Sequence, residues 1–283
     1  MRSNHVGVIG LAIAMAFNSV ASAQTPGGDE WDYGEDAAKK LSIAAVTFET
    51  FGVAVRCSDD RLSVVVSGLP VASGERKLRY QMGTGEDAES VWVSGRNSNA
   101  AFAVWPRRIA GDLGRGGTLS LAAMDGEQVR RYRVDLPPSS VAIPRVMAAC
   151  GHEMETQDDA PTGESLAGLR WVRRPDVSFP SQTTAETGLA AIQCWVRDNG
   201  GLRDCEIESE FPEGGGFGRA ATLGTHRSAR VAATDGSEGG TDGRRVAFVV
   251  RYNSYEALMA PPPSRLPNRD GAYERLNGVP ARD

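Results

Sequence analysis

The sequence predicts an α+β protein with two folded domains: a β-rich, sandwich-like amino-terminal domain and a small ββαβ domain. Three observations support this. Short Val- and Ala-rich segments alternate with turn signals over residues 41–151. Residues 152–170 are acidic and lack apolar periodicity, which is typical of a linker. Residues 171–253 then show the order strand, turn, strand, short helix, strand.

Residues 1–23 have the pattern of a secretory signal peptide. Arg2 is followed by an apolar run of about a dozen residues and by Ala21-Ser22-Ala23. The run is shorter than the roughly 20 residues of a membrane-spanning helix, so we expect cleavage, with an uncleaved anchor as the alternative. We therefore expect a periplasmic protein of a Gram-negative bacterium, with no membrane span after cleavage.

The charge balance disfavours nucleic acid as a partner. The chain of 283 residues carries a formal net charge of −5, and loss of Arg2 with the signal would leave −6. Nucleic acids and anionic lipids call for clustered Lys and Arg instead. The charge balance therefore argues against both as the main partner.

Four cysteines in an exported chain indicate two disulfides, with three connectivities open. We favour Cys57–Cys150 and Cys194–Cys205, because each pair then lies inside one domain. Four reduced, buried thiols are the alternative, and the export signal argues against them.

Within the first domain, residues 24–40 are predicted to be a loose leader. Ser58-Asp59-Asp60 supplies a turn between two strands. One short helix is expected from Pro106 to Gly114 or Gly116, and another from Ser139 or Ser140 to Gly151. The strand candidates are residues 44–57, 61–69, 77–82, 89–95, 118–124 and 129–136.

Asn199-Gly200 is the strongest hairpin signal of the second domain. A two-residue turn there places Cys194 opposite Cys205 and Ile192 opposite Ile207, so that the disulfide and the apolar pattern specify one register. A short helix bearing Phe217, Ala220, Ala221 and Leu223 follows, and then a strand with Val246, Phe248, Val250 and Tyr252 on one face.

Residues 172–252 resemble the TonB carboxy-terminal domain family; the first domain shows no such resemblance. The features that carry it are Pro175, Phe179-Pro180, Gly188, Gly200-Gly201-Leu202, Ile207-Glu208-Ser209-Glu210, Pro212, Phe217, Ala220-Ala221 and Tyr252.

The resemblance implies a protein-binding role in the periplasm, in which the last strand adds to a short strand of an outer-membrane transporter. The strand with Val246, Phe248, Val250 and Tyr252 is thus the candidate partner-binding strand. The alternative is an ordinary core strand whose edge is covered by the tail. Because this chain has no long Pro-rich spacer, the resemblance favours a binding module over an energy transducer.

The sequence offers no convergent catalytic residues. Three histidines are present, and no G-x-S-x-G elbow or metal-ligand spacing accompanies them. We expect His152 and His226 at the surface, and Glu208 and Glu210 on a solvated strand face. Trp195, which points away from the Cys194 face, is a candidate exposed platform.

We therefore predict a non-enzymatic envelope protein without metal or cofactor, associated with TonB-dependent transport. Residues 254–283 are expected to be a disordered tail. Dimerisation through the final strand is a further expectation, because an uncovered edge can pair with its twin. The alternative is an envelope enzyme or enzyme inhibitor that acts through the first domain.

Overall fold

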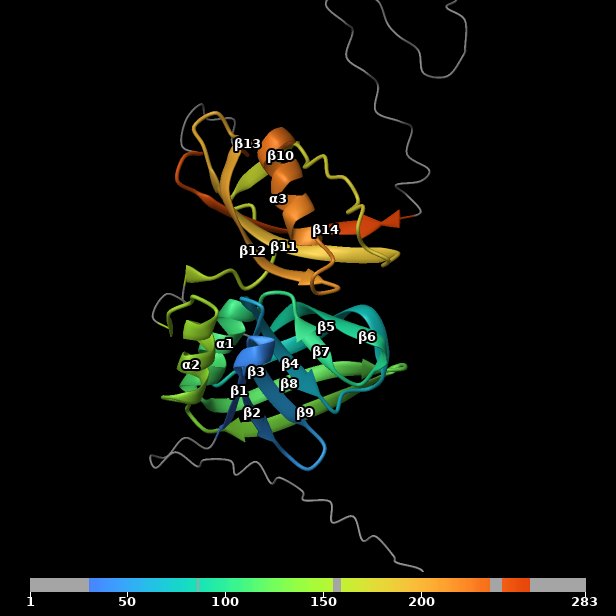
Figure 1. Cartoon of the computed structure of the whole chain (residues 1–283), viewed down its shortest axis with the longest axis vertical. Coiled ribbons are helices and arrows are strands. Elements are labelled where there is room, and N and C mark those ends of the chain that lie inside the picture. The colour runs from blue at the N-terminus through green and yellow to red at the C-terminus, as the bar shows by residue number, and fades with distance from the viewer. Residues whose placement is uncertain (1–30, 86, 155–158, 235–240, 255–283) are drawn as a thin grey trace, which may run out of the picture.

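The computed structural model describes residues 31–85, 87–154, 159–234 and 241–254. The predicted signal peptide and nearly all of the predicted tail lie outside these ranges. We call residues 31–154 the first unit and residues 159–254 the second unit (Figure 1).

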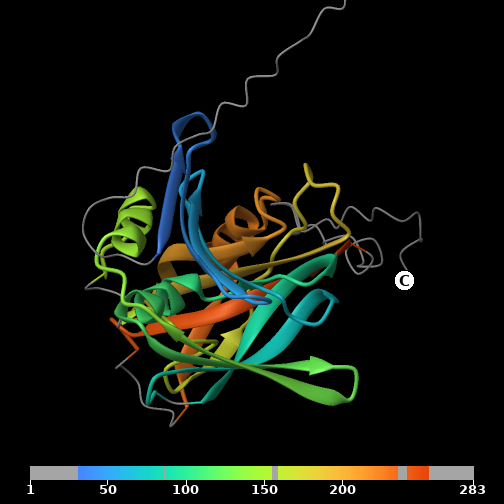
Figure 2. The same cartoon turned by 90° about the horizontal axis from the view of Figure 1, so that it is seen from below.

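The first unit is built on one antiparallel sheet of nine strands that curls into a half-barrel. Its strand order is β1-β2-β3-β4-β7-β6-β5-β8-β9. Figure 2 shows the curl from below, with the early strands in blue and β8 and β9 in green. The bounds are β1 Asp32–Asp36, β2 Leu41–Thr47, β3 Gly52–Ser58, β4 Arg61–Ser67, β5 Ala72–Met82, β6 Ala88–Ser98, β7 Ala101–Ala103, β8 Gly117–Asp125 and β9 Gln128–Leu136.

The strand β1 lies where we expected a loose leader, and a short 3-10 helix, Ala37–Lys39, follows it. The strand pairs with β2 along its whole length. Trp31 anchors its start, because the side chain is buried and its Nε1 donates to the Pro137 carbonyl at 2.9 Å. The predicted strand 44–57 is in fact the hairpin of β2 and β3. The predicted turn at Asp59 and Asp60 is confirmed, and both residues have the positive φ that such a two-residue turn needs.

Two helices cover one side of the half-barrel: α1, Pro106–Arg115, and α2, Ala142–Ala149. Pro106 opens α1 at the position where a missing N–H costs nothing. The Ser139 hydroxyl accepts a hydrogen bond from the Ile143 N–H at 2.9 Å at the start of α2. The disulfide Cys57–Cys150 then ties the end of α2 to β3, as predicted.

The second unit combines two small sheets with one helix. A three-stranded antiparallel sheet has the order β12-β11-β14, and β10 pairs with β13 in a second sheet. The bounds are β10 Leu169–Arg173, β11 Thr187–Val196, β12 Leu202–Phe211, α3 Phe217–Ser228, β13 Arg230–Ala233 and β14 Arg245–Asn253.

The hairpin of β11 and β12 follows the predicted register only in part. Ile192 lies opposite Ile207, as predicted. The turn differs, because the Arg197 N–H donates to the Gly201 carbonyl at 2.8 Å, which leaves a loop of residues 198–200 instead of a two-residue turn. A bulge with Asp204 at φ +47° restores the predicted pairing further along.

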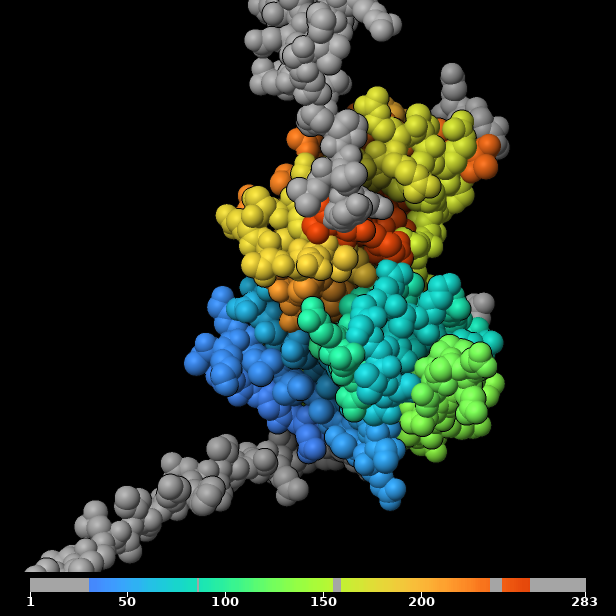
Figure 3. Space-filling view, turned by 90° about the vertical axis from the view of Figure 1, so that its right-hand side faces the viewer, coloured from blue at the N-terminus to red at the C-terminus, as the bar shows by residue number. Residues whose placement is uncertain are grey.

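The three-stranded sheet is buried on both faces. On one face, Ile192 and Phe248 pack in the core beneath α3. On the other, Ala191 and Ala247 pack against Trp105 of the first unit. The space-filling view shows the two units in contact, with β14 (red) reaching the surface just above the first unit (Figure 3).

The predicted fold class is wrong. The structure is mostly β, with 51 % strand and 17 % helix, and its first unit is one curled sheet instead of a sandwich. The reason is β7, a strand of three residues that pairs with both β4 and β6 and joins two groups of strands into one ladder. In the second unit, β10 and β13 add to the predicted ββαβ order.

Candidate protein-binding groove

The outer edge of β14 presents backbone groups that β11 does not use. Successive residues of an antiparallel strand direct their N–H and C=O groups to opposite sides, so every second residue points to the same side. The Ala247 N–H donates to Ser165 at 2.8 Å, on the side away from β11. The backbone groups of Val249 and Arg251 therefore point outward as well.

Residues 164 and 165 cover the first part of this edge. Ser165 and Ala247 exchange two backbone hydrogen bonds of 2.7 and 2.8 Å. The Glu164 carboxylate accepts a third, from the Val249 N–H at 2.7 Å. In the described ranges, no named strand other than β11 pairs with β14. Among the described residues, the edge is thus satisfied at Ala247 and at the Val249 N–H, and the outward backbone groups of Arg251 remain for another strand.

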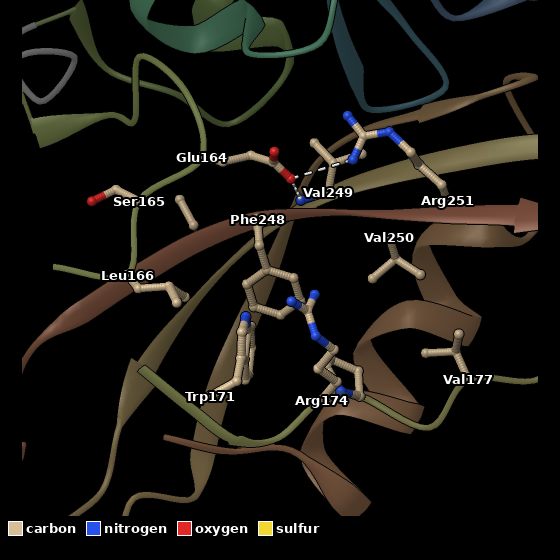
Figure 4. Close-up of a pocket in the computed structure, with 12 residues that line it drawn as sticks. Glu164, Ser165, Leu166, Trp171, Arg174, Val177, Phe248, Val249, Val250 and Arg251 are labelled. Carbon is tan, nitrogen blue, oxygen red and sulfur yellow. Dashed lines mark hydrogen bonds and ion pairs between the residues drawn. The ribbon is translucent and has the colours of Figure 1, made fainter. Parts of the chain in front are cut away.

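A groove of about 450 Å³ runs beside this edge (Figure 4). We call it the β14 groove. Its apolar floor includes Trp171 and Phe248, whose rings meet edge to face with centroids 5.0 Å apart. The residues that line it are Glu164, Ser165, Leu166, Trp171, Arg174, Pro175, Val177, Ala247, Phe248, Val249, Val250 and Arg251.

Two arginines supply the positive charge of the β14 groove. Arg251 donates to both carboxylate oxygens of Glu75 at 2.8 and 2.9 Å and lies 3.5 Å from Glu164. The hydrogen bonds to Glu75 are the main reason that the pKa of Arg251 is raised. Arg174 points toward the Phe248 ring (Figure 4) and forms no ion pair with any described residue. Removal of the Glu164 carboxylate would leave the groove with an unbalanced positive charge.

The predicted partner-binding residues lie on the core side of β14. Val246, Phe248, Val250 and Tyr252 are all buried, and the Tyr252 hydroxyl donates to the Phe217 carbonyl at 3.0 Å. Burial raises the pKa of Tyr252, with a smaller contribution from Glu210. Their side chains are therefore taken up by the core, and of the four only Phe248 and Val250 line the β14 groove.

Trp195, the candidate platform, is half-buried. The guanidinium of Arg245 lies over its ring, 4.3 Å from the centroid. One face of the indole is therefore already occupied by a cation–π contact. The other disulfide, Cys194–Cys205, forms as predicted.

The acidic pair expected on a solvated face is buried. Glu208 is 5 % exposed and Glu210 is 8 % exposed. The Arg107 Nε donates to both oxygens of Glu208 at 2.9 and 3.0 Å. Glu210 accepts the N–H groups of Gly214 and Gly218, at the start of α3. The prediction of a solvated face was wrong because it treated the hairpin alone, whereas the first unit covers this face of β12.

Burial raises the pKa of Glu208 above its usual range, although the hydrogen bonds and charge of Arg107 oppose this. His152 lies near the same pair, and burial, then the charge of Arg107, lowers its pKa. His152 is half-buried, in contrast to the predicted surface position, whereas His226 is exposed. The cluster holds the two units together.

A wider cleft of about 900 Å³ lies between the units. Two ion pairs border it, Arg56 with Glu213 and Arg251 with Glu75. Its charged walls are thus largely paired with each other. The β14 groove, with its open backbone groups, is the better candidate for binding.

No group of three or more His, Cys, Asp or Glu residues is placed to hold a metal in the described ranges. Among the same residues, no helix has the length and apolarity needed to cross a membrane.

These features define a class: a disulfide-bonded, mostly β protein in which an open edge strand borders a groove. Two disulfides agree with an extracytoplasmic location. No family model matches the chain, and neither the curated proteins nor the solved structures contain a match. The resemblance to the TonB carboxy-terminal domain therefore stays a prediction.

Sequence reasoning missed Glu164 and Ser165, which it placed in a linker. No periodic signal marks them, because they contact β14 through one bridge that spans about 80 residues of chain. It also missed the second buried face of β11. There a signal existed: residues 189–196, LAAIQCWV, are apolar at nearly every position, which is typical of a strand covered on both sides.

Proposed function

We propose that the protein is a periplasmic, non-enzymatic binding protein that accepts an extended segment of an envelope protein as an added strand on the outer edge of β14. The observation that carries the proposal is the outward backbone edge at Ala247, Val249 and Arg251 beside the β14 groove, which residues 164 and 165 occupy only in part. A strand placed there gains affinity from backbone hydrogen bonds and specificity from side chains that enter the groove.

The geometry also limits other modes of binding. Both faces of the three-stranded sheet are covered, one by α3 and the other by the first unit. The opposite edge strand, β12, lies against β4 and α1 of the first unit. A partner therefore reaches this sheet through the β14 edge.

The resemblance to the TonB carboxy-terminal domain supports the choice of partner. It favours a short strand of an outer-membrane transporter, and thus a role in TonB-dependent transport. A second copy of the chain is the competing occupant of the same edge.

The test uses the tagged full chain and a variant in which proline blocks the edge. Val249→Pro removes an outward N–H and leaves the ladder to β11 intact, because Val249 donates to Glu164 and not to β11. Val249→Ala is the matched control, since it shortens the same side chain and keeps the N–H. Both variants are compared with the wild-type chain on detergent-solubilised envelopes.

We expect the wild type and Val249→Ala to retain the same outer-membrane protein and Val249→Pro to lose it. Retention of that protein by Val249→Pro would refute the proposal. Sedimentation of the purified chain tests the competing occupant. If the wild type is a dimer and Val249→Pro is a monomer, the occupant of the edge is a second copy of the chain and not a transporter.

A further inference from the structure

The outer edge of β14 already holds a short piece of the chain in the manner of an added strand. Ser165 forms an antiparallel bridge with Ala247. The neighbouring Glu164 and Leu166 flank this bridge at the β14 groove (Figure 4). The local sequence is an acidic residue, a small polar residue and a large aliphatic residue.

Each of the three residues satisfies a different feature of the site. Ser165 supplies the backbone pair to Ala247. The Glu164 carboxylate takes the place of a backbone carbonyl at the Val249 N–H and lies 3.5 Å from Arg251. Leu166 is partly buried and packs against the apolar core of the second unit.

We propose that residues 164–166 are an internal competitor for the β14 groove. The partner strand would then carry the same pattern, an acidic residue followed by a small and a large aliphatic residue, and run antiparallel to β14. This inference rests on the proposed function only in taking the β14 edge as the binding site.

Charge supports the acidic position. Displacement of residues 164–166 withdraws the Glu164 carboxylate from Arg251, which keeps Glu75 as its partner, and removes the one acidic side chain among the described residues that line the groove beside Arg251 and Arg174. An acidic side chain on the incoming strand restores the balance in a partly enclosed site, where a charge pair interacts more strongly than in open water.

The internal segment is also weakly held. It covers the edge with three hydrogen bonds and leaves the outward groups of Arg251 to a longer strand. Glu164 and Ser165 are exposed. Ala167, directly after the segment, has φ +50°, a conformation that costs a residue with a side chain. An independent strand that continues past Val249 makes more backbone contacts without this strain.

The experiment measures binding of a fluorescent nine-residue peptide with the sequence of residues 161–169, PTGESLAGL, to the full chain by fluorescence anisotropy. Ser165→Pro removes the N–H that bonds to Ala247 and frees the edge. Ser165→Ala keeps that N–H and is the matched control. Loss of net hydrogen bonds of ordinary strength predicts at least about tenfold tighter binding to Ser165→Pro than to wild type or Ser165→Ala.

Peptide specificity is tested with a scrambled peptide and with one in which Gln replaces the acidic residue. Both should bind Ser165→Pro at least about fivefold more weakly than the parent peptide does, since a charge-assisted contact is worth more than a neutral one. Equal binding of all three peptides would overturn the pattern, and equal affinity of wild type and Ser165→Pro would overturn the competitor.

Two further variants guard against local unfolding by proline. Glu164→Ala keeps the backbone and should tighten binding by about tenfold or more, from the loss of one hydrogen bond to a charged group. A cross-strand disulfide built with Ser165→Cys and Ala247→Cys should abolish binding in the oxidised protein, whereas Ser165→Cys alone should bind like the wild type. Binding to the locked, oxidised form would contradict the proposal.

The same variants separate the inference from the proposed function. Peptide binding that is tighter to Ser165→Pro, with no envelope protein retained by that variant, would refute the partner and keep the competitor. Capture that depends on Val249 but is unchanged by Ser165→Pro, with unchanged peptide affinity, would refute the competitor alone.

Discussion

The contact between Arg107 and Glu208 gives the sharpest stability prediction. The Glu208 side chain is completely buried between the two units, and Arg107 is its ion-pair partner. Arg107→Ala would leave that carboxylate without a counter-charge. Removal of one partner of a buried ion pair costs about 3–5 kcal/mol, so we expect a loss of this size in the free energy of unfolding at pH 7.

The loss should depend on pH in a defined direction. Burial raises the pKa of Glu208 in the folded protein, and Arg107 opposes this rise, so the pKa increases further in Arg107→Ala. When the pKa of a carboxyl is higher in the folded than in the unfolded protein, the group stabilises the fold at a pH below the unfolded pKa, here about 4.5. This stabilisation is lost as the pH rises through the folded pKa. The variant should therefore be close to wild type near pH 4 and far below it at pH 7.

The assay is urea unfolding followed by tryptophan fluorescence at both pH values. Arg108→Ala is the matched control. Arg108 lies next in α1 and pairs with Asp112 at 3.4 Å, and a more exposed pair of this kind is worth about 1 kcal/mol or less. Replacement of both partners, Arg107→Met with Glu208→Leu, should recover most of the loss. A loss below about 1 kcal/mol at pH 7, or one that is equal at both pH values, would refute the reasoning.

Three more predictions follow from other parts of the structure. Deletion of the disulfide between β3 and α2 should cost about 4–5 kcal/mol of unfolding free energy, and deletion of the one between β11 and β12 about 3 kcal/mol, measured by urea unfolding of the paired Cys→Ala variants. Gly188→Ala should lower the free energy of unfolding by about 1–3 kcal/mol in a thermal melt, because its new Cβ would lie 2.3 Å from the buried Phe217 ring. Gly163→Ala is the control and should change little, because its Cβ would meet nothing within 4 Å. The pKa of His152 measured by NMR titration should lie below 6.5 and rise in Arg107→Ala, because the charge of Arg107 is one cause of the lowered pKa. An unchanged pKa would show that Arg107 does not act on His152.

Local patterns located most strands of the first unit, because each hairpin carries its own turn residues and apolar alternation. The assembly of those strands was not predictable in the same way. A strand as short as β7 has no periodicity to detect, yet its pairing with β4 and β6 decides between two stacked sheets and one curled sheet. Trp31 likewise orders β1 through a contact with Pro137, more than 100 residues away.

In the second unit, the Cys194–Cys205 disulfide and the core face of β14 followed from spacing and alternation. The groove could not be derived, because three separate segments form it: residues 164–166, residues 171–177 and β14. Glu164 and Ser165 sit in a stretch that looks like a linker, since polar residues without periodicity have the same sequence signature whether they are solvated or satisfy a strand edge.

The docking of the two units changes what the resemblance can imply. A small sheet with one free face can bind a partner through side chains on that face. In this chain the second face is buried against Trp105 and its neighbours, and Arg107 with Glu208 fixes the position. Glu75 of the first unit in turn holds Arg251 at the end of the β14 groove. The first unit therefore closes the second face, orients Arg251 at one end of the groove and leaves the backbone edge as the route to the sheet. Loss of the Arg107 contact should accordingly weaken peptide binding, even though Arg107 lies outside the groove.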